Sequence, residues 1–298
     1  IVNSNSLFSL NHVKKSIRSM IEDKVNSFIN APDDSINLGN IEKLSLNENV
    51  NIYWGDEPIG LIKKGKNVFS PIAESYNSNF LDSNKKNQIT IKLQKWIDDK
   101  ISTTLKPVKD DIDDLIPSDL RTIFFNLFNS LGTMEIEDYK TIIKNLTKEN
   151  KIKISKMGVR IGAKFFFVPN FLKKYAMELN ALLWRIYNKT SDTDLYPLPK
   201  DGRVAFVPST LLPTSYWLAI GYVLIDNYAV RVDVFEKIFF LARQKFKSGP
   251  FLESSELMNP VGCDPTSLAK ILLFCGFDNI TLNDEKKIFF AKQKNMKK

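Results

Sequence analysis

Residues 151–189, KIKISKMGVRIGAKFFFVPNFLKKYAMELNALLWRIYNK, contain a strand pattern followed directly by a helix pattern. The strand-like segment covers 159–168 and ends in three phenylalanines before Pro169, which interrupts it. Helical apolar spacing continues over 170–188, with Asn170 as the candidate N-cap. This succession is typical of a mixed α+β chain.

The predicted helix over 170–188 has an apolar stripe and a mixed face. At about 100° per residue the stripe is about 120° wide, which predicts the buried side of the helix. It comprises Phe171, Leu172, Tyr175, Leu179, Leu182, Leu183 and Ile186. Trp184 falls on the other face, near Lys173 and Asn180, where an aromatic ring can stack a base while cations hold phosphate. Packing of Trp184 against a neighbouring domain is the alternative, and the sequence leaves both open.

Residues 151–189 also carry all of the excess positive charge of the chain. They contain nine Lys or Arg residues and one acid, Glu178, for a net charge of +8, which equals the formal charge of the whole chain. A concentrated basic strip favours docking of a polyanion, most commonly nucleic acid, over a merely solvated lysine face. We expect RNA or single-stranded nucleic acid to bind here. The candidate contacts are Lys156, Arg160, Lys164, Lys173, Lys174 and Arg185 for phosphates and Trp184 for stacking.

The composition predicts a globular protein with room for two or three domains. The chain has 298 residues, of which 43% are apolar and 26% charged. Its only cysteines are Cys263 and Cys275 and its only histidine is His12, which disfavours a disulfide framework and a zinc site. We therefore expect a cytoplasmic protein. No apolar run reaches about 18 residues, so no membrane span is expected.

Four segments are predicted along the chain. Residues 1–48 form a weak amphipathic helix and a linker, and residues 49–150 form a β-hairpin with a helical domain. Residues 151–200 are the basic strand–helix segment. Residues 201–298 are a winged-helix-like α+β domain, because a helix, a short helix, a turn, a second helix and a strand follow one another there. The overall prediction is a mainly helical α+β fold.

Individual elements are predicted within these segments. The alternation over 49–72 indicates a hairpin that turns at 56–58. Helices are predicted over 89–105, from Pro117 to Gly132, and over 135–150. Asp264 and Pro265 supply a cap and a first-turn proline for the second helix of the winged-helix-like domain. That helix has Lys270 as its only basic residue, which is poor for reading bases in a major groove.

No catalytic or cofactor-binding set is expected in the chain. Residues 60–66 have the spacing of a phosphate-binding loop, but Asn67 stands where Ser or Thr would hold Mg²⁺. The acidic cluster at 110–114 lacks the glycine and closing glutamate of a Ca²⁺ loop. A basic hairpin and a solvated loop are the expected structures instead.

Several short motifs carry a family resemblance. They are WGDEPIG (54–60), MGVRIG (157–162) running through FVP (167–169) to LLW (182–184), YAVRVD (228–233), and MNPVGC (258–263) with LLFCGF (272–277). Together they resemble the C-terminal region of alphaproteobacterial superfamily-two helicases, proteins related to the RNA helicase of the mitochondrial degradosome. The resemblance covers about residues 49–280.

The resemblance implies an ATP-driven motor N-terminal to Ile1, with ATP and Mg²⁺ bound only there. The chain itself has no Walker A loop, acidic Mg²⁺ box or arginine-finger motif. We therefore expect a non-catalytic accessory module that holds RNA or single-stranded nucleic acid beside the motor. A protein-interaction scaffold is the alternative, in which the basic strip docks an acidic partner or the 110–114 cluster of another copy.

Overall fold

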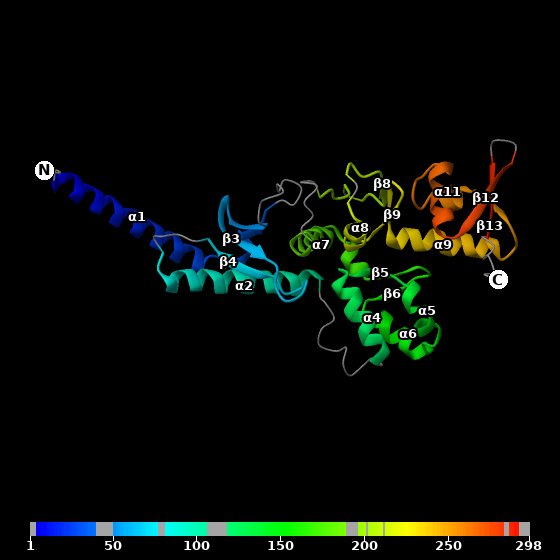
Figure 1. Cartoon of the computed structure of the whole chain (residues 1–298), viewed down its shortest axis with the longest axis horizontal. Helices are drawn as coiled ribbons and strands as arrows, with labels where there is room; N and C mark the ends of the chain where they lie inside the picture. The colour runs from blue at the N-terminus through cyan, green and yellow to red at the C-terminus, as the bar shows by residue number, and fades with distance from the viewer. Residues whose placement is uncertain are drawn as a thin grey trace. The chain divides into compact units, whose positions relative to one another are not determined.

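The structure is a computed structural model that divides into two compact units (Figure 1). It describes residues 4–39, 50–76, 81–105, 118–188, 196–200, 202–210, 212–282 and 286–291. The N-terminal unit comprises residues 1–106 and 185–195, and the C-terminal unit comprises 107–184 and 196–298. These boundaries differ from the predicted ones at 48, 150 and 200. The predicted class is confirmed, because the chain is α+β and mainly helical with a small N-terminal sheet.

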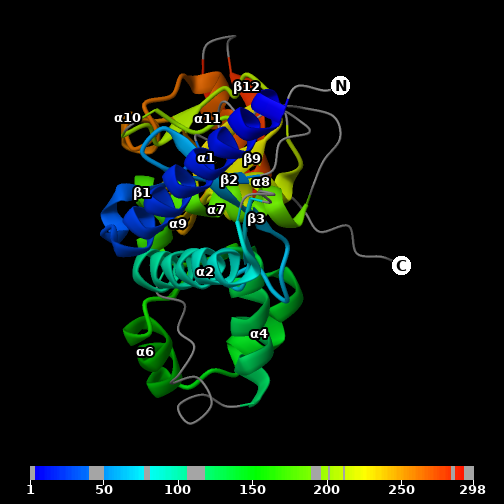
Figure 2. The same ribbon diagram turned by 90° about the vertical axis from the view of Figure 1, so that its left-hand side faces the viewer.

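The N-terminal unit is an antiparallel sheet covered by helices. Its elements are α1 (Ser4–Asn30), η1 (Asp33–Ser35), β1 (Ile36–Leu38), β2 (Val50–Trp54), β3 (Glu57–Lys63), β4 (Ile72–Ser75) and α2 (Ser83–Leu105). The strand order is β1-β2-β3-β4, and the predicted hairpin is β2–β3. Its turn lies at Gly55 and Asp56, with Pro58 already in β3. The ammonium of Lys92 on α2 donates to backbone carbonyls at the end of α1, and both ribbon views show the two helices side by side (Figure 1 and Figure 2).

The apolar face predicted for α2 is the buried one. Its five buried predicted residues are Ile89, Leu93, Trp96, Ile97 and Ile101. The indole N–H of Trp96 donates to the Asp33 carbonyl, so this large ring is buried with its polar group satisfied. Helical periodicity therefore predicted this element and its orientation correctly.

The C-terminal unit begins with helices around a small sheet and continues into a helix-rich part. Its first elements are α4 (Ser118–Asn129), β5 (Thr133–Glu135), η3 (Glu137–Tyr139), α5 (Lys140–Lys144), α6 (Lys148–Lys156), β6 (Arg160–Ile161), β7 (Phe165–Phe167), η4 (Pro169–Leu172) and α7 (Lys174–Tyr187). Residues 185–187, at the end of α7, are counted with the N-terminal unit. The remaining ones are β8 (Ala205–Phe206), α8 (Thr214–Ala219), β9 (Tyr222–Ile225), β10 (Tyr228–Arg231), α9 (Val232–Phe246), β11 (Phe251–Leu252), α10 (Ser255–Met258), α11 (Pro265–Phe274), β12 (Phe277–Leu282) and β13 (Lys286–Ala291). Three sheets have the orders β5-β7-β6, β8-β10-β9 and β11-β13-β12.

Three predicted elements in this unit are wrong in their extent. The helix predicted over 135–150 is replaced by β5, η3, α5 and α6, because Glu135 pairs with Phe165 across the sheet and Thr147 caps a new helix. The single strand predicted over 159–168 is a tight hairpin, in which Gly162 N–H donates to the Phe165 carbonyl. Pro169 opens η4, so α7 starts at Lys174 and Asn170 does not cap it.

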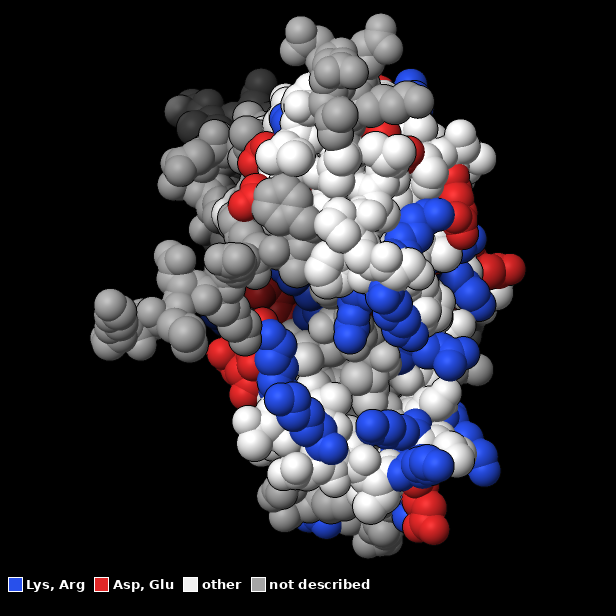
Figure 3. All heavy atoms as spheres, turned by 90° about the vertical axis from the view of Figure 1, so that its right-hand side faces the viewer, with Lys and Arg blue, Asp and Glu red and all other residues white. Residues whose placement is uncertain are grey.

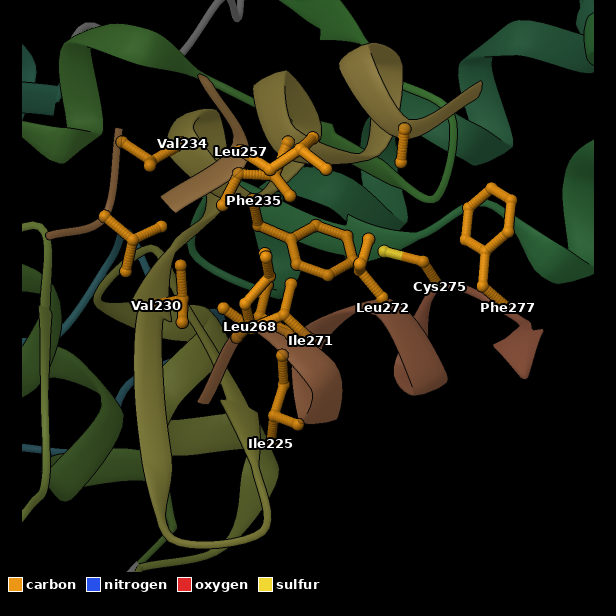
Figure 4. Packing of buried hydrophobic residues seen from close by; sticks show 14 of the residues in the cluster. Ile225, Val230, Val234, Phe235, Leu257, Leu268, Ile271, Leu272, Cys275 and Phe277 are labelled. Carbon is orange, nitrogen blue, oxygen red and sulfur yellow. The ribbon is translucent and has the colours of Figure 1, made fainter. Parts of the chain in front are cut away.

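The core of the last third of the chain is built around Phe235 on α9. Figure 4 shows its ring pointing toward Leu268, Ile271 and Leu272 of α11. The ring centroid lies 5.7 Å from that of Phe274, edge to face. Asp264 caps α11 as predicted, since its carboxylate accepts from the backbone N–H of residues 266 and 267. The winged-helix interpretation of residues 201–298 stays a prediction.

Candidate nucleic-acid interface

One face of the C-terminal unit combines basic side chains with a cleft. Figure 3 shows Lys and Arg side chains gathered over the lower half of this face, around a hollow. The cleft has a volume of about 1030 Å³. One wall is the β6–β7 hairpin with Pro169, and the other is α9. Residues far apart in sequence therefore line the same depression.

Arg160 is the one candidate from the basic strip that lines this cleft. Its side chain is exposed on β6, and one guanidinium N–H donates to the Ser155 hydroxyl at 3.1 Å. That bond fixes the guanidinium beside the end of α6 without neutralising its charge. Arg160 is thus held in place and still able to bind an anion.

Two cations at the end of α9 line the cleft together with Arg160, and neither was predicted from the sequence. Arg243 and Lys247 are exposed and line the opposite wall. They lie about a turn apart, together with Glu236 and Phe240, on one helical stripe. The basic strip is a local concentration of charge along the sequence, whereas Arg243 and Lys247 follow the strip by more than fifty positions. The helical spacing of the polar residues within 233–247 was the available signal.

The cleft acids are both occupied by bonds within the protein. The Asp233 carboxylate accepts two hydrogen bonds from the Arg231 guanidinium, at 2.7 and 2.9 Å. The Glu236 carboxylate accepts from the backbone N–H groups of Ala163, Lys164 and Phe165, at 2.6, 2.8 and 2.8 Å. Among the described residues, Arg160, Arg243 and Lys247 form no ion pair with either acid. The cleft is therefore left with a net positive character.

The bonds to Glu236 also determine the shape of one wall. Three successive backbone N–H groups converge on this buried carboxylate, as they would on a bound anion. The turn between β6 and β7 is thereby joined to α9. Glu236 is consequently a positioning residue for Arg160 and not a surface acid.

Lys164 differs from its predicted role as a phosphate contact. It is half-buried, its ammonium donates to the Phe274 carbonyl, and the nitrogen lies 4.3 Å from the centroid of the Phe274 ring. A cation at the last turn of α11 is favourable because the free carbonyls there are electron-rich. Lys164 therefore holds the hairpin against α11 and does not line the cleft.

The remaining lysine candidates are exposed but lie outside the cleft lining. Lys156 ends α6, Lys173 precedes α7, and Lys174 is the first residue of α7. The Lys173 ammonium lies 6.0 Å from the centroid of the Tyr175 ring. All three stay candidates for phosphate contacts on the surface of the C-terminal unit.

Trp184 and Arg185 do not have the exposure that their predicted roles require. Trp184 is 4% exposed and its ring packs edge to face on Tyr216, with centroids 5.2 Å apart. Arg185 is 6% exposed. The base-stacking interpretation of Trp184 is therefore wrong, and the ring packs within the C-terminal unit and not against a neighbouring domain. Arg185 likewise does not present a surface charge.

The error arose because α7 is enclosed on more sides than its apolar stripe indicated. Asn180, predicted on the polar face, is fully buried and donates to the backbone carbonyls of Leu131 and Ala219, at 3.2 and 3.0 Å. Those bonds satisfy the amide nitrogen and permit burial. Tyr175, predicted in the buried stripe, is 53% exposed. A polar residue with internal partners cannot be told from a surface residue by spacing alone.

The two cysteine thiols are protonated at neutral pH. Burial raises the pKa of Cys263 to about 11, and burial also raises the pKa of Cys275 strongly. Raised thiol pKa values fit a structural role for both residues, since a reactive cysteine needs its thiolate form. The acidic cluster at 110–114 lies outside the described residues.

Comparisons with known proteins identify no relative. No family model matches the chain, and neither the curated proteins nor the solved structures contain a match. Within the described ranges, no three His, Cys, Asp or Glu side chains are grouped as metal ligands would be. None of the described helices combines the length and apolar character needed to cross a bilayer. The function is therefore inferred from the geometry of the cleft and from the motifs in the sequence.

Proposed function

We propose that this chain is a non-catalytic C-terminal accessory module of an ATP-dependent helicase, which binds RNA or single-stranded nucleic acid. The motifs at 54–60, 157–169 and 228–233 support the helicase assignment through their resemblance to the superfamily-two proteins. ATP and Mg²⁺ would be bound by motor domains that precede Ile1. The module would hold the strand on which the motor acts.

One observation carries the binding proposal. Three cations from distant segments line one cleft, while the two acids of the cleft accept hydrogen bonds from other groups of the protein. Arg160 lies on one wall, and Arg243 and Lys247 on the other. Phosphate oxygens are strong acceptors for guanidinium and ammonium groups, and their repeat along a strand suits several cations in a row. This arrangement favours a phosphodiester backbone over a neutral ligand.

The geometry favours the cleft over α11 as the binding surface. If residues 201–298 are a winged helix, as the succession α9, β11, α10, α11 and the β12–β13 hairpin supports, α11 would occupy the base-reading position. Its only basic side chain, Lys270, lies 3.6 Å from the carboxylate of Asp226. A helix with one paired lysine is poorly suited to a phosphate-lined groove.

The proposal is tested by removing the two α9 cations. We expect the double variant Arg243→Gln, Lys247→Gln to bind a labelled single-stranded RNA more weakly. The slope of log affinity against log salt should also fall by about 1.4, since each lost phosphate contact removes about 0.7. The matched control is Lys14→Gln, Lys15→Gln, which removes the same charge from exposed positions on α1. Equal affinity and slope in the two double variants would contradict the proposal.

A further inference from the structure

An exposed phenylalanine lies inside the basic cleft. Phe240 is 59% exposed and lines the cleft from α9. Its neighbours Phe235 and Phe239 belong to the core, where their ring centroids are 6.3 Å apart. Phe240 has no aromatic ring contact in the described part of the chain. The side chain therefore contributes little to the core and presents its ring to solvent in the cleft.

The surroundings of Phe240 distinguish it from a scattered surface apolar residue. Single exposed apolar side chains are common and need no function. Phe240, however, shares a wall with Arg243 and Lys247, and Gln244 lies one turn further along α9. Arg160 stands on the facing wall. An aromatic ring between cations is the arrangement that binds a base and its flanking phosphates together.

We propose that this cleft is a base-stacking site, in which one unpaired base lies on the Phe240 ring while adjacent phosphates contact Arg160, Arg243 and Lys247. This inference rests on the proposed function and specifies its site. It also selects single strands over duplexes, because the bases of a duplex already stack on both faces and cannot reach the ring. The Gln244 amide, which offers both donors and an acceptor, is positioned to contact the edge of the stacked base.

The size and rigidity of the cleft suit this role. Its volume of about 1030 Å³ lies just above the roughly 300–1,000 Å³ typical of small-ligand pockets, so it has room for a nucleotide and its neighbours. The bonds from residues 163–165 to Glu236 hold the two walls at a fixed separation. A preformed slot loses less entropy on binding than a surface that must order itself.

The test compares two phenylalanine variants on two probes. Phe240→Ala removes the proposed stacking ring, and Phe125→Ala removes a phenylalanine that is 67% exposed on α4 and does not line the cleft. The probes are a labelled oligouridylate about 12 nucleotides long and an abasic ribose-phosphate strand of the same length. Binding is followed by fluorescence anisotropy, and thermal unfolding checks that both variants fold.

We expect Phe240→Ala to bind the oligouridylate about fivefold or more weakly than the wild-type chain does, because stacking one base on an aromatic ring contributes about 1–3 kcal/mol. Its salt slope and its affinity for the abasic strand should stay at the wild-type values, and Phe240→Trp should restore binding. Phe125→Ala should match the wild type on both probes. A wild-type affinity in Phe240→Ala, with normal salt dependence, would overturn the stacking site alone. If the wild-type chain bound neither probe, the proposed function would be overturned, and the stacking site with it.

Discussion

The Glu236 carboxylate lies so close to Gly162 that a β-carbon at residue 162 would stand 2.3 Å from Glu236 Cδ. Only a glycine permits this approach, and the approach lets three N–H groups of the following residues reach the carboxylate. The β6–β7 turn and α9 are joined through this contact. Since those two elements are the walls of the cleft, the contact links the packing of the fold to its candidate binding site.

Gly162→Ala should lower the free energy of unfolding by about 1–3 kcal/mol, the usual cost of an added methyl group in a filled site. The new methyl group would have to displace the Glu236 carboxylate or the turn. Denaturant unfolding measures the change. Wild-type stability in this variant would show that the turn and α9 are not in close contact.

The double variant Gly162→Ala, Glu236→Ala separates the clash from other effects of the alanine. Glu236→Ala alone should cost about 3 kcal/mol, because it leaves several buried donors without their acceptor. Without the glutamate side chain the added methyl group meets no carboxylate. The double variant should therefore lose less stability than the sum of the two single losses, by at least about 1 kcal/mol. Strict additivity would contradict the contact.

The Asp264 cap of α11 should make stability depend on pH in the acid range. A hydrogen bond from the Ser267 hydroxyl, with further bonds from the backbone N–H groups of Ser267 and Thr266, lowers the pKa of Asp264 from 3.8 to about 2. A lowered pKa in the folded state means that the carboxylate stabilises the fold above about pH 4, and that this contribution is lost as the pH falls toward 2.

The stability difference between the wild type and Asp264→Asn should accordingly shrink between pH 5 and pH 2, as measured by thermal unfolding at several pH values. Ser267→Ala removes the strongest of the bonds that lower the pKa of Asp264, so in that variant the pH-dependent contribution should be smaller and should be fully lost at a higher pH. A pH-independent difference between Asp264→Asn and the wild type would argue against a charged cap.

Trp184→Ala should destabilise the C-terminal unit by about 3–5 kcal/mol, because it leaves a cavity beside Tyr216. Trp184→Phe should cost less and should bind RNA with wild-type affinity, since the indole ring does not reach solvent. Chemical unfolding and anisotropy on the same samples check both points. A fully folded Trp184→Phe variant with lost affinity would restore Trp184 as a stacking residue.

The secondary structure was predictable where one periodicity persisted over a long segment. The buried face of α2 and the β2–β3 hairpin follow directly from their apolar spacing. The pattern failed over 133–168, where short strands alternate with turns. There the local structure depends on partners far away in the sequence. The Phe165 N–H, for example, donates to the carboxylate of Glu236, which is 71 residues further along the chain. No window of sequence contains both of these groups.

The candidate site was predictable only in part for the same reason. Arg160 stood out because it belongs to a charged run, whereas Arg243 and Phe240 have neighbours of ordinary composition. The fold assembles the cleft by bringing the β6–β7 hairpin against α9 through β7 and the turn before it. The exposure of Trp184 was predicted wrongly because residues on the polar side of α7, such as Asn180, are buried and have hydrogen-bond partners inside the protein.

Binding of a single-stranded polyanion to the basic face is tested most directly by the salt dependence of RNA binding by the unmodified chain. Anisotropy of a labelled single-stranded RNA would be measured at about 50 and about 200 mM salt. Three phosphate contacts, by Arg160, Arg243 and Lys247, should lower the affinity roughly tenfold or more over that range. No binding at the lower salt, or binding that salt does not weaken, would contradict the claim and make the cleft a surface for another class of partner.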